Sequence, residues 1–218
     1  MNDALEVCHR LFEAYGPRHW WPGDGPFEVI VGAILTQNTA WTNVEKAIAN
    51  LRAARVLSAA GLAGLSPDEL AELIRPAGYF RAKSRALHGF VDHLFACHGG
   101  ELARIFAAET GALREELLAL RGVGPETADS ILLYAAERPV FVIDAYTVRI
   151  GSRLGWGEPG KGYDWWQHLF ESALPRDATL FNEYHALLVH HGKYVCRARG
   201  PLCDACVVAH MCPRVGIG

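Results

Sequence analysis

Four cysteines near the C-terminal end place the strongest constraint on how this 218-residue chain can fold. They are Cys196, Cys203, Cys206 and Cys212, and their spacing is C-x6-C-x2-C-x5-C. The first residues lack a basic region followed by a long apolar stretch, and no apolar run approaches the roughly 18 residues that cross a bilayer. We therefore expect a cytosolic protein that does not enter a membrane. In that reducing compartment four clustered thiolates could bind a tetrahedral Zn²⁺ or an iron–sulfur cluster.

The composition identifies a globular chain but says little about its activity. Half of the residues are hydrophobic and 21% are charged, which excludes disordered and fibrous proteins. The net charge of −3 argues against a uniformly basic nucleic-acid-binding surface, although it leaves room for local basic patches. Cys8 and Cys97 stand apart in helical sequence, so we expect both to be buried as small apolar side chains.

The spacing of apolar residues predicts an all-α fold. A helix is expected to begin at Pro26, and capping boxes at Thr42–Glu45 and Ser66–Glu69 indicate the starts of two more. Further helices are expected over residues 83–97, 113–120, 126–136, 145–154, 163–174 and 179–191. Residues 139–143 alone have the composition of a strand, and without a partner strand they are interpreted as an extended connector.

A short glycine-containing turn separates two of these helices. Gly122, Val123 and Gly124 allow a tight turn and leave backbone amides exposed at the start of the next helix. Such amides can bind a nucleic-acid phosphate without reading the base sequence. Taken alone, the pattern is equally typical of an ordinary turn.

Three segments together resemble the endonuclease III (HhH-GPD) superfamily of DNA glycosylases. They are Leu-Arg-Gly-Val-Gly-Pro-Glu-Thr-Ala-Asp at 120–129, Phe-Val-Ile-Asp-Ala-Tyr-Thr-Val-Arg at 141–149, and the four-cysteine segment. The resemblance extends over residues 26–212. It implies a six-helix domain at 26–135 that carries a helix-hairpin-helix, and a second helical domain made of 1–25 and 136–218 that binds a [4Fe–4S] cluster. It also implies a monomer that binds damaged double-stranded DNA between these domains, in the cytoplasm at the nucleoid.

The same resemblance assigns the catalytic carboxylate to Asp144, a residue type that also caps helices well. Members that cleave the DNA strand carry a lysine two residues after the second hairpin glycine, and its amine forms a Schiff base with the sugar. This chain has Glu126 there. A carboxylate cannot form an imine, which predicts a monofunctional glycosylase that uses water. Glu126 could simply complement the helix dipole.

Three tryptophans suggest the substrate. Trp20 and Trp21 precede the first long helix and Trp41 follows it, which resembles the MagIII-type 3-methyladenine glycosylases. That resemblance implies that Trp20 or Trp21 covers one face of the flipped base and Trp41 the other. Cation–π attraction to a charged N-alkylpurine would contribute about 0.5–2 kcal/mol per contact. Ordinary packing is the alternative, and MagIII-type enzymes lack the four cysteines.

The remaining predictions concern the residues that contact DNA. Gln37 matches the position from which the family inserts a polar side chain into the vacated base stack. Arg197 and Arg199, beside the first cluster cysteine, are expected to bind the DNA backbone. A second basic group contains Arg75, Arg81, Lys83 and Arg85. Either group could also be an ordinary solvated surface.

Three functions remain open on these grounds. The first is a monofunctional glycosylase that hydrolyses the bond to an N-alkylated purine. The second is an oxidised-pyrimidine glycosylase with weak AP-lyase activity, with mismatch- or adenine-excising enzymes between the two. The third is a non-catalytic binder of damaged DNA, against which Asp144 argues because its charge would repel phosphate.

Overall fold

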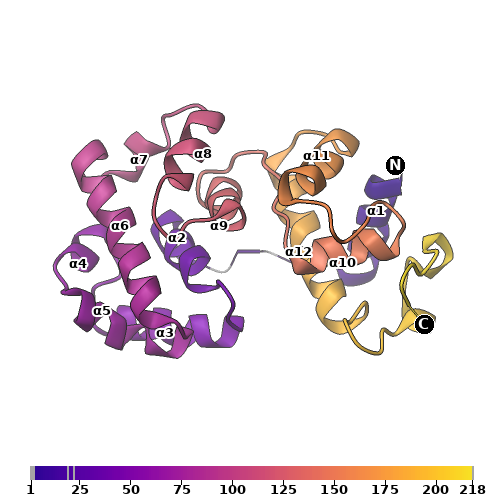
Figure 1. Cartoon of the computed structure of the whole chain (residues 1–218), viewed down its shortest axis with the longest axis horizontal. Coiled ribbons are helices and arrows are strands. Elements are labelled where there is room, and N and C mark those ends of the chain that lie inside the picture. Colours follow the sequence, from indigo (N-terminus) through magenta and orange to yellow (C-terminus); the bar gives the residue numbers. More distant parts are fainter. Residues whose placement is uncertain (1–2, 19, 22, 218) are drawn as a thin grey trace. The chain divides into compact units, whose positions relative to one another are not determined.

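The computed structural model of the chain describes residues 3–18, 20–21 and 23–217. Within those ranges the regular structure is entirely helical, which confirms the all-α prediction (Figure 1). None of the helices in these ranges has the length and apolar character needed to cross a bilayer. The chain divides into two compact units: one is Trp21–Arg138, and the other combines Met1–Trp20 with Pro139–Gly218.

The first unit is built around an apolar central helix. Its elements are α2 (Pro26–Leu35), α3 (Trp41–Ala53), α4 (Ala59–Ala63), α5 (Pro67–Leu73), η1 (Arg75–Ala77), α6 (Phe80–His98), α7 (Leu102–Ile105), α8 (Thr110–Leu118), α9 (Pro125–Ser130) and the π-helical turn η2 (Ile131–Ala135). Every residue of α2 from Glu28 to Leu35 is buried. Because α2 contacts α3, α6, α9 and η2, it forms the core that positions the turn before α9.

Of the two expected capping boxes, one is present. Ser66 accepts a hydrogen bond from the Glu69 backbone amide while the Glu69 carboxylate accepts from the Ser66 backbone amide, as predicted. The prediction at Thr42 was wrong: α3 begins two residues earlier, at Trp41, with Ala40 and not Thr42 as the N-cap, and Ala40 has no side-chain hydrogen bond. The Glu45 carboxylate instead accepts a hydrogen bond from Trp41 Nε1 at 3.0 Å, so it does not complete a box.

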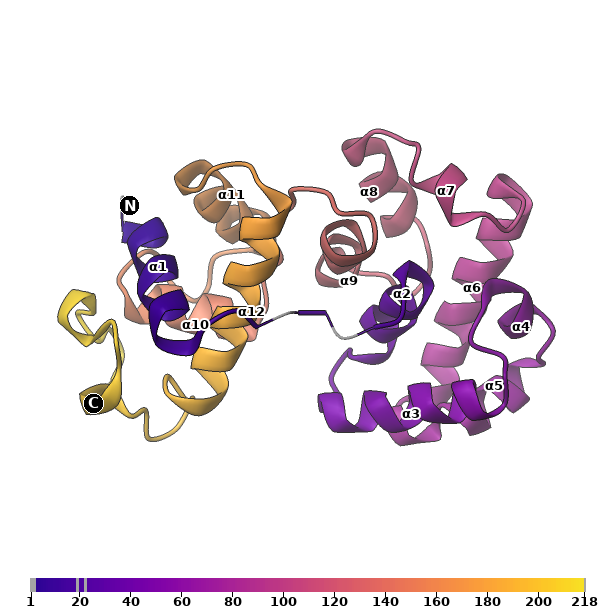
Figure 2. The ribbon, with the colours of Figure 1, turned by 180° about the vertical axis from the view of Figure 1, so that it is seen from behind.

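The second unit contains the terminal segments. Its elements are α1 (Asp3–Tyr15), α10 (Ala145–Arg153), α11 (Tyr163–Ala173), α12 (Ala178–Tyr194), η3 (Cys203–Ala205) and η4 (Ala209–Met211). The view from behind in Figure 2 shows α1 beside α12, and α10 packs on α12 as well. The long helix α12, with Phe181, Tyr184 and Leu188 fully buried, is therefore the centre of this unit.

Residues 139–143 form an extended connector, as predicted, and side chains of α11 take the place of a partner strand. The backbone amide of Phe141 donates to Glu171 Oε1 at 2.9 Å, and its carbonyl accepts from Gln167 Nε2 at 2.9 Å. The amide of Ile143 donates to the Tyr163 hydroxyl. These bonds satisfy a buried backbone that no sheet covers, and they fix the direction in which the chain enters α10.

The two isolated cysteines differ in burial. Cys8 on α1 is buried, as expected, whereas the prediction for Cys97 was wrong because this residue is exposed. Cys97 lies on the outer side of α6, where its Sγ atom is 3.7 Å from His93 Nδ1. Helical periodicity at this position therefore did not indicate burial.

Candidate active site and cysteine loop

Asp144 caps the helix that follows the extended connector. Its Oδ1 atom accepts hydrogen bonds from the backbone amide of Thr147 at 2.7 Å and from the Thr147 hydroxyl at 2.9 Å. Both interactions use the same carboxylate oxygen. The cap therefore fixes the orientation of the carboxyl group while Oδ2 takes no part in it.

A histidine that sequence reasoning missed lies opposite the other carboxylate oxygen. His185 Nε2 on α12 is 3.6 Å from Asp144 Oδ2. Burial lowers the pKa of His185, and the Asp144 charge only partly opposes this effect. The ring is therefore mostly neutral near pH 7 and does not place a full positive charge beside Asp144. No local motif marks His185, because the two residues come from different helices 41 positions apart.

The Gly122–Gly124 turn has a geometry that requires glycine at its first position. Gly122 has a φ of +89°, and a Cβ atom there would lie 3.0 Å from the Ala86 Cβ atom of α6. Gly124 is the N-cap of α9, and nothing lies within 4 Å of the position of its missing Cβ. Val123 between them is buried and anchors the turn. The backbone thus turns sharply with open space over Gly124.

A buried ion pair joins the helices on either side of this turn. Arg114 on α8 donates from Nε to Asp129 Oδ1 at 2.7 Å and from Nη2 to Oδ2 at 3.1 Å. The side chain of Asp129 is fully buried and that of Arg114 is 25% exposed. This paired geometry links α8 to α9, and no sequence pattern identified it.

Gln37 follows α2 and contacts the same turn. Its Nε2 atom donates to the Gly122 carbonyl and to the Thr127 hydroxyl, both at 2.9 Å. Insertion of this side chain into a base stack would require both hydrogen bonds to break. The inserting role of Gln37 stays a prediction, and in the structure the residue supports the turn.

Glu126 lies in the first turn of α9 and is exposed. Its carbonyl accepts a hydrogen bond from the Ser130 hydroxyl at 2.7 Å. The whole sequence has four lysines, at 46, 83, 161 and 193, so none falls between residues 84 and 160. The turn and the helix after it therefore contain no primary amine.

Two of the predicted tryptophans lie in direct contact. Trp21 and Trp41 have ring centroids 5.0 Å apart and planes at 90°, and Trp21 also packs on Tyr134 of η2 at 5.1 Å. The Trp21 ring lies over Gly32 of α2, where a Cβ atom would be 3.0 Å from Trp21 Nε1. A planar base could stand between Trp21 and Trp41 only after one ring moved. Trp20 is half-buried, and Tyr134 is an aromatic neighbour that sequence reasoning missed.

The four C-terminal cysteines surround a common cavity. Cys196, Cys203, Cys206 and Cys212 line a space of about 20 Å³ together with Val195, Leu202 and Ala209. Burial raises the pKa of Cys206 and of Cys212, and the charges of the other cluster cysteines raise both further. None of the six cysteines is in a disulfide. Four thiols that line one small cavity fit a metal centre.

Arginines from α10 hold the loop that carries the first cysteine. Arg149 donates to the carbonyls of Cys196 at 3.0 Å and Gly192 at 2.7 Å, and Arg153 donates to Cys196 Sγ at 3.3 Å and to the Arg197 carbonyl at 2.7 Å. Arg197 turns back to donate to the Gly200 carbonyl at 2.8 Å. Arg197 and Arg199 are both exposed.

Lys83 does not belong to the second basic group, which was predicted to contain Arg75, Arg81, Lys83 and Arg85. Lys83 is 4% exposed, and its Nζ donates to the carbonyls of Leu35 and Ala77, both at 2.8 Å. It satisfies carbonyl groups at the last residues of α2 and η1, so its assignment to a basic surface was wrong. Arg75, Arg81 and Arg85 are exposed.

Comparison with known proteins identifies similar chains over most of the length of this one. The model of the HhH-GPD superfamily of base excision DNA repair proteins matches residues 31–176. A Methanocaldococcus jannaschii protein, MJ1434, provisionally named a DNA repair glycosylase, is 46% identical over 217 residues, covering 97% of this chain and 98% of its own.

Two solved structures are similar in fold. The 3-methyladenine DNA glycosylase MagIII of H. pylori, solved with 1,N6-ethenoadenine, has 28% identity and a TM-score of 0.78, over 88% of this chain and 97% of its own. Endonuclease III in a trapped covalent intermediate with DNA has 22% identity and a TM-score of 0.84, over 98% and 96% of the two chains.

Proposed function

The chain belongs to the HhH-GPD superfamily of base excision DNA repair proteins and is a DNA glycosylase of that family, and we propose that it is a monofunctional enzyme that removes N-alkylated purines from duplex DNA. Monofunctional here means that water, and not an enzyme amine, attacks the sugar. The observation that carries this proposal is Glu126, an exposed carboxylate at the start of α9, in a stretch of 77 residues without lysine.

The chemistry at Glu126 distinguishes two routes. An enzyme that cleaves the strand forms an imine between a primary amine and the sugar, and a carboxylate cannot do so. Endonuclease III has been trapped as a covalent intermediate with DNA. The Trp21–Arg138 unit of this chain has two lysines, Lys46 and Lys83. Lys83 is buried, and its amine donates to two carbonyl oxygens. Hydrolysis is the route that the side chains around the turn support.

The aromatic residues support an alkylated purine as substrate. Trp21, Trp41 and Tyr134 form one contiguous aromatic surface in the unit that also carries the turn. An N-alkylated purine carries positive charge, and stacking on an indole stabilises a cation by about 0.5–2 kcal/mol more than its burial alone. The similar MagIII protein is a 3-methyladenine glycosylase and has been solved with a modified adenine. One of the two tryptophan rings must move to admit the base.

Asp144 supplies the reactive carboxylate. The bond from sugar to a cationic alkylpurine breaks readily because the base leaves as a neutral molecule, so no general acid is required. Asp144 Oδ1 is engaged in the helix cap, and Oδ2 is the oxygen that stabilises the developing positive charge on the sugar and takes a proton from the attacking water. The neutral His185 opposite Oδ2 leaves this charge available.

Binding to DNA is assigned to the turn and to the cysteine loop. Backbone amides at Gly122, Val123 and Gly124 would bind phosphate oxygens, and Gln37 would enter the base stack once released from the turn. The four cysteines fit a [4Fe–4S] cluster, because their thiols line one small cavity and Arg153 donates to Cys196 Sγ. When bound, the cluster would fold the loop that presents Arg197 and Arg199 to the DNA backbone.

The decisive experiment separates base release from strand cleavage. Purified protein is incubated with duplex DNA containing methylated purines, and released bases and strand nicks are counted before and after alkali. We expect base release, with nicks only after alkali. Direct nicking would refute the monofunctional mechanism, and no release of methylated purines would refute the substrate and favour oxidised pyrimidines, mismatches or simple damage binding.

An Asp144→Asn variant tests catalysis against binding. Asparagine caps helices about as well as aspartate, so α10 keeps its start while the charge is lost. We expect damaged-DNA binding to survive and base release to fall by roughly 10²–10⁴-fold, the range typical of a positioned acid or base. Unchanged base release would exclude Asp144 as the catalytic carboxylate.

A further inference from the structure

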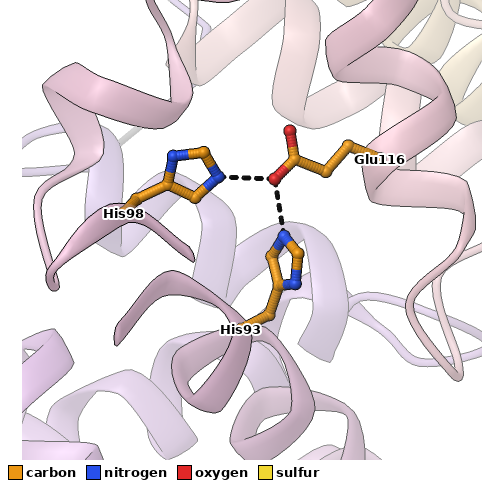
Figure 3. Close-up of side chains that lie close together, drawn as sticks. All are labelled: His93, His98 and Glu116. Carbon is orange, nitrogen blue, oxygen red and sulfur yellow. Dashed lines mark hydrogen bonds and ion pairs between the residues drawn. The ribbon is translucent and has the colours of Figure 1, made fainter. Parts of the chain in front are cut away.

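Two histidines and a glutamate converge at one point in the Trp21–Arg138 unit, apart from every residue assigned above. His93 and His98 lie on α6, and Glu116 projects toward them from α8. The Nε2 atom of each histidine is 2.5 Å from the same carboxylate oxygen, Glu116 Oε1 (Figure 3). Figure 3 also shows the second carboxylate oxygen directed away from both rings.

We propose that His93, His98 and Glu116 form a binding site for Zn²⁺. One atom from each residue lies within 4.8 Å of the others, so all three can face a single ion. Two imidazole nitrogens and one carboxylate oxygen, with water in the fourth position, are a ligand set that Zn²⁺ accepts in tetrahedral geometry. The side chains are 17–25% exposed, so an ion can reach them from solvent while most of their surface is held by the protein.

The adjustment required for binding is small. Ligands at about 2.0–2.1 Å from a tetrahedral ion are about 3.3 Å apart, so Glu116 Oε1 must move away from each nitrogen by less than about 1 Å. A glutamate side chain at the surface of a helix can move this far by rotation. The two histidine–carboxylate hydrogen bonds are replaced by two metal–nitrogen bonds, and each ring gives up the proton on Nε2 to solvent and carries a proton on Nδ1 instead.

Cys97 supports the orientation that a metal ligand needs. Its Sγ atom is 3.7 Å from His93 Nδ1, on the side of the ring opposite Nε2. In the tautomer that binds a metal, the proton of His93 lies on Nδ1, and a hydrogen bond from this N–H to sulfur leaves the lone pair of Nε2 directed at the shared point. Metal-ligating histidines usually have such a partner on their second nitrogen, and its loss typically weakens binding 10–100-fold.

A bound ion is expected to link the C-terminal end of α6 to α8. His98 is the last residue of α6, and α8 is the helix that Arg114 and Asp129 join to α9. A bound ion would restrain α8 relative to α6 and slow its local opening. This site adds to the proposed glycosylase function and does not depend on it.

The test must separate these histidines from the four cysteines, which can also bind Zn²⁺. Full-length protein labelled with ¹⁵N at histidine is titrated with ZnCl₂, and the Nε2 resonances of His93 and His98 are followed together with amide exchange in α8. Glu116→Gln is the informative variant, because an amide oxygen still accepts hydrogen bonds from both rings but is a poor metal ligand. His98→Gln is the second variant, Cys97→Ser tests the supporting contact, and His9→Gln on α1 is the matched control.

Saturable shifts of both Nε2 resonances as one equivalent of Zn²⁺ binds beyond that taken up by the cysteines, with slower exchange in α8, are the expected result. Glu116→Gln and His98→Gln should each weaken binding at least about 100-fold, and Cys97→Ser about 10-fold, while His9→Gln leaves it unchanged. The proposal is overturned if the two resonances do not move while Zn²⁺ binds elsewhere. It is equally overturned if Glu116→Gln binds as tightly as the wild-type protein, which would show that the carboxylate only accepts hydrogen bonds.

Discussion

The ion pair between Arg114 and Asp129 allows a quantitative prediction about the turn that precedes α9. Replacing Arg114 with Met keeps the length of the side chain but leaves the fully buried Asp129 carboxylate without its guanidinium. Removing one partner of a buried pair costs about 3–5 kcal/mol, and the 25% exposure of Arg114 places this case at the lower end, at about 3 kcal/mol. At the tenfold change per 1.4 kcal/mol, α9 should then open about 100-fold more often.

Native-state hydrogen exchange measures this opening locally, which matters because two units need not unfold together. The reporter is the Ala128 amide, which donates to the Gly124 carbonyl at 2.9 Å. Arg75→Met is the matched control, since Arg75 and Glu72 form an exposed pair with both side chains more than half exposed. Adding Asp129→Asn to Arg114→Met removes the buried charge and should recover part of the loss. The reasoning is refuted if Arg114→Met exchanges no faster than the Arg75→Met control.

Four further predictions concern substrate, mechanism, pH and DNA contacts. Trp21→Ala and Trp41→Ala should each reduce the release of a cationic methylpurine about 2- to 30-fold more than the release of a neutral purine, as measured by single-turnover kinetics. An equal loss on the two substrates would indicate that the tryptophans only pack. Glu126→Lys places an amine at the start of α9, and we expect direct nicks and a protein–DNA adduct trapped by borohydride; neither product would mean that this position cannot reach the sugar. Burial lowers the pKa of His185, so its contribution to stability is complete above the unfolded-state pKa of about 6.5 and is lost as pH falls below that value. The wild-type protein should therefore lose more stability than His185→Gln between about pH 7.5 and pH 5. Parallel pH profiles of the two proteins in urea unfolding would contradict this. Arg199→Ala should reduce the slope of log K for DNA binding against log salt by about 1, whereas Lys83→Met should destabilise the fold and leave the slope unchanged, because Lys83 is buried on backbone carbonyls.

The sequence by itself determined the features that depend on residues close together in the chain. Helix starts follow from local hydrogen bonds, as Ser66 and Glu69 show, and the turn at Gly122–Gly124 follows from a backbone conformation that glycine adopts without strain. The spacing of the four cysteines allowed them to line one space because short loops restrict how far apart their side chains can lie. The replacement of lysine by Glu126, on which the proposed mechanism depends, also required no structure.

Only the tertiary structure decided which distant residues meet and which way ambiguous side chains point. Lys83 lies among basic residues in the sequence, yet it faces inward, where its amine donates to carbonyl groups at the ends of α2 and η1. His185 lies opposite Asp144, and Arg114 opposite Asp129, through helix packing that no periodicity encodes. Trp21 and Trp41 meet edge to face because Gly32 leaves room for a ring on α2. Partners tens of residues apart are set by the packing of complementary surfaces, and a local pattern contains no information on that packing.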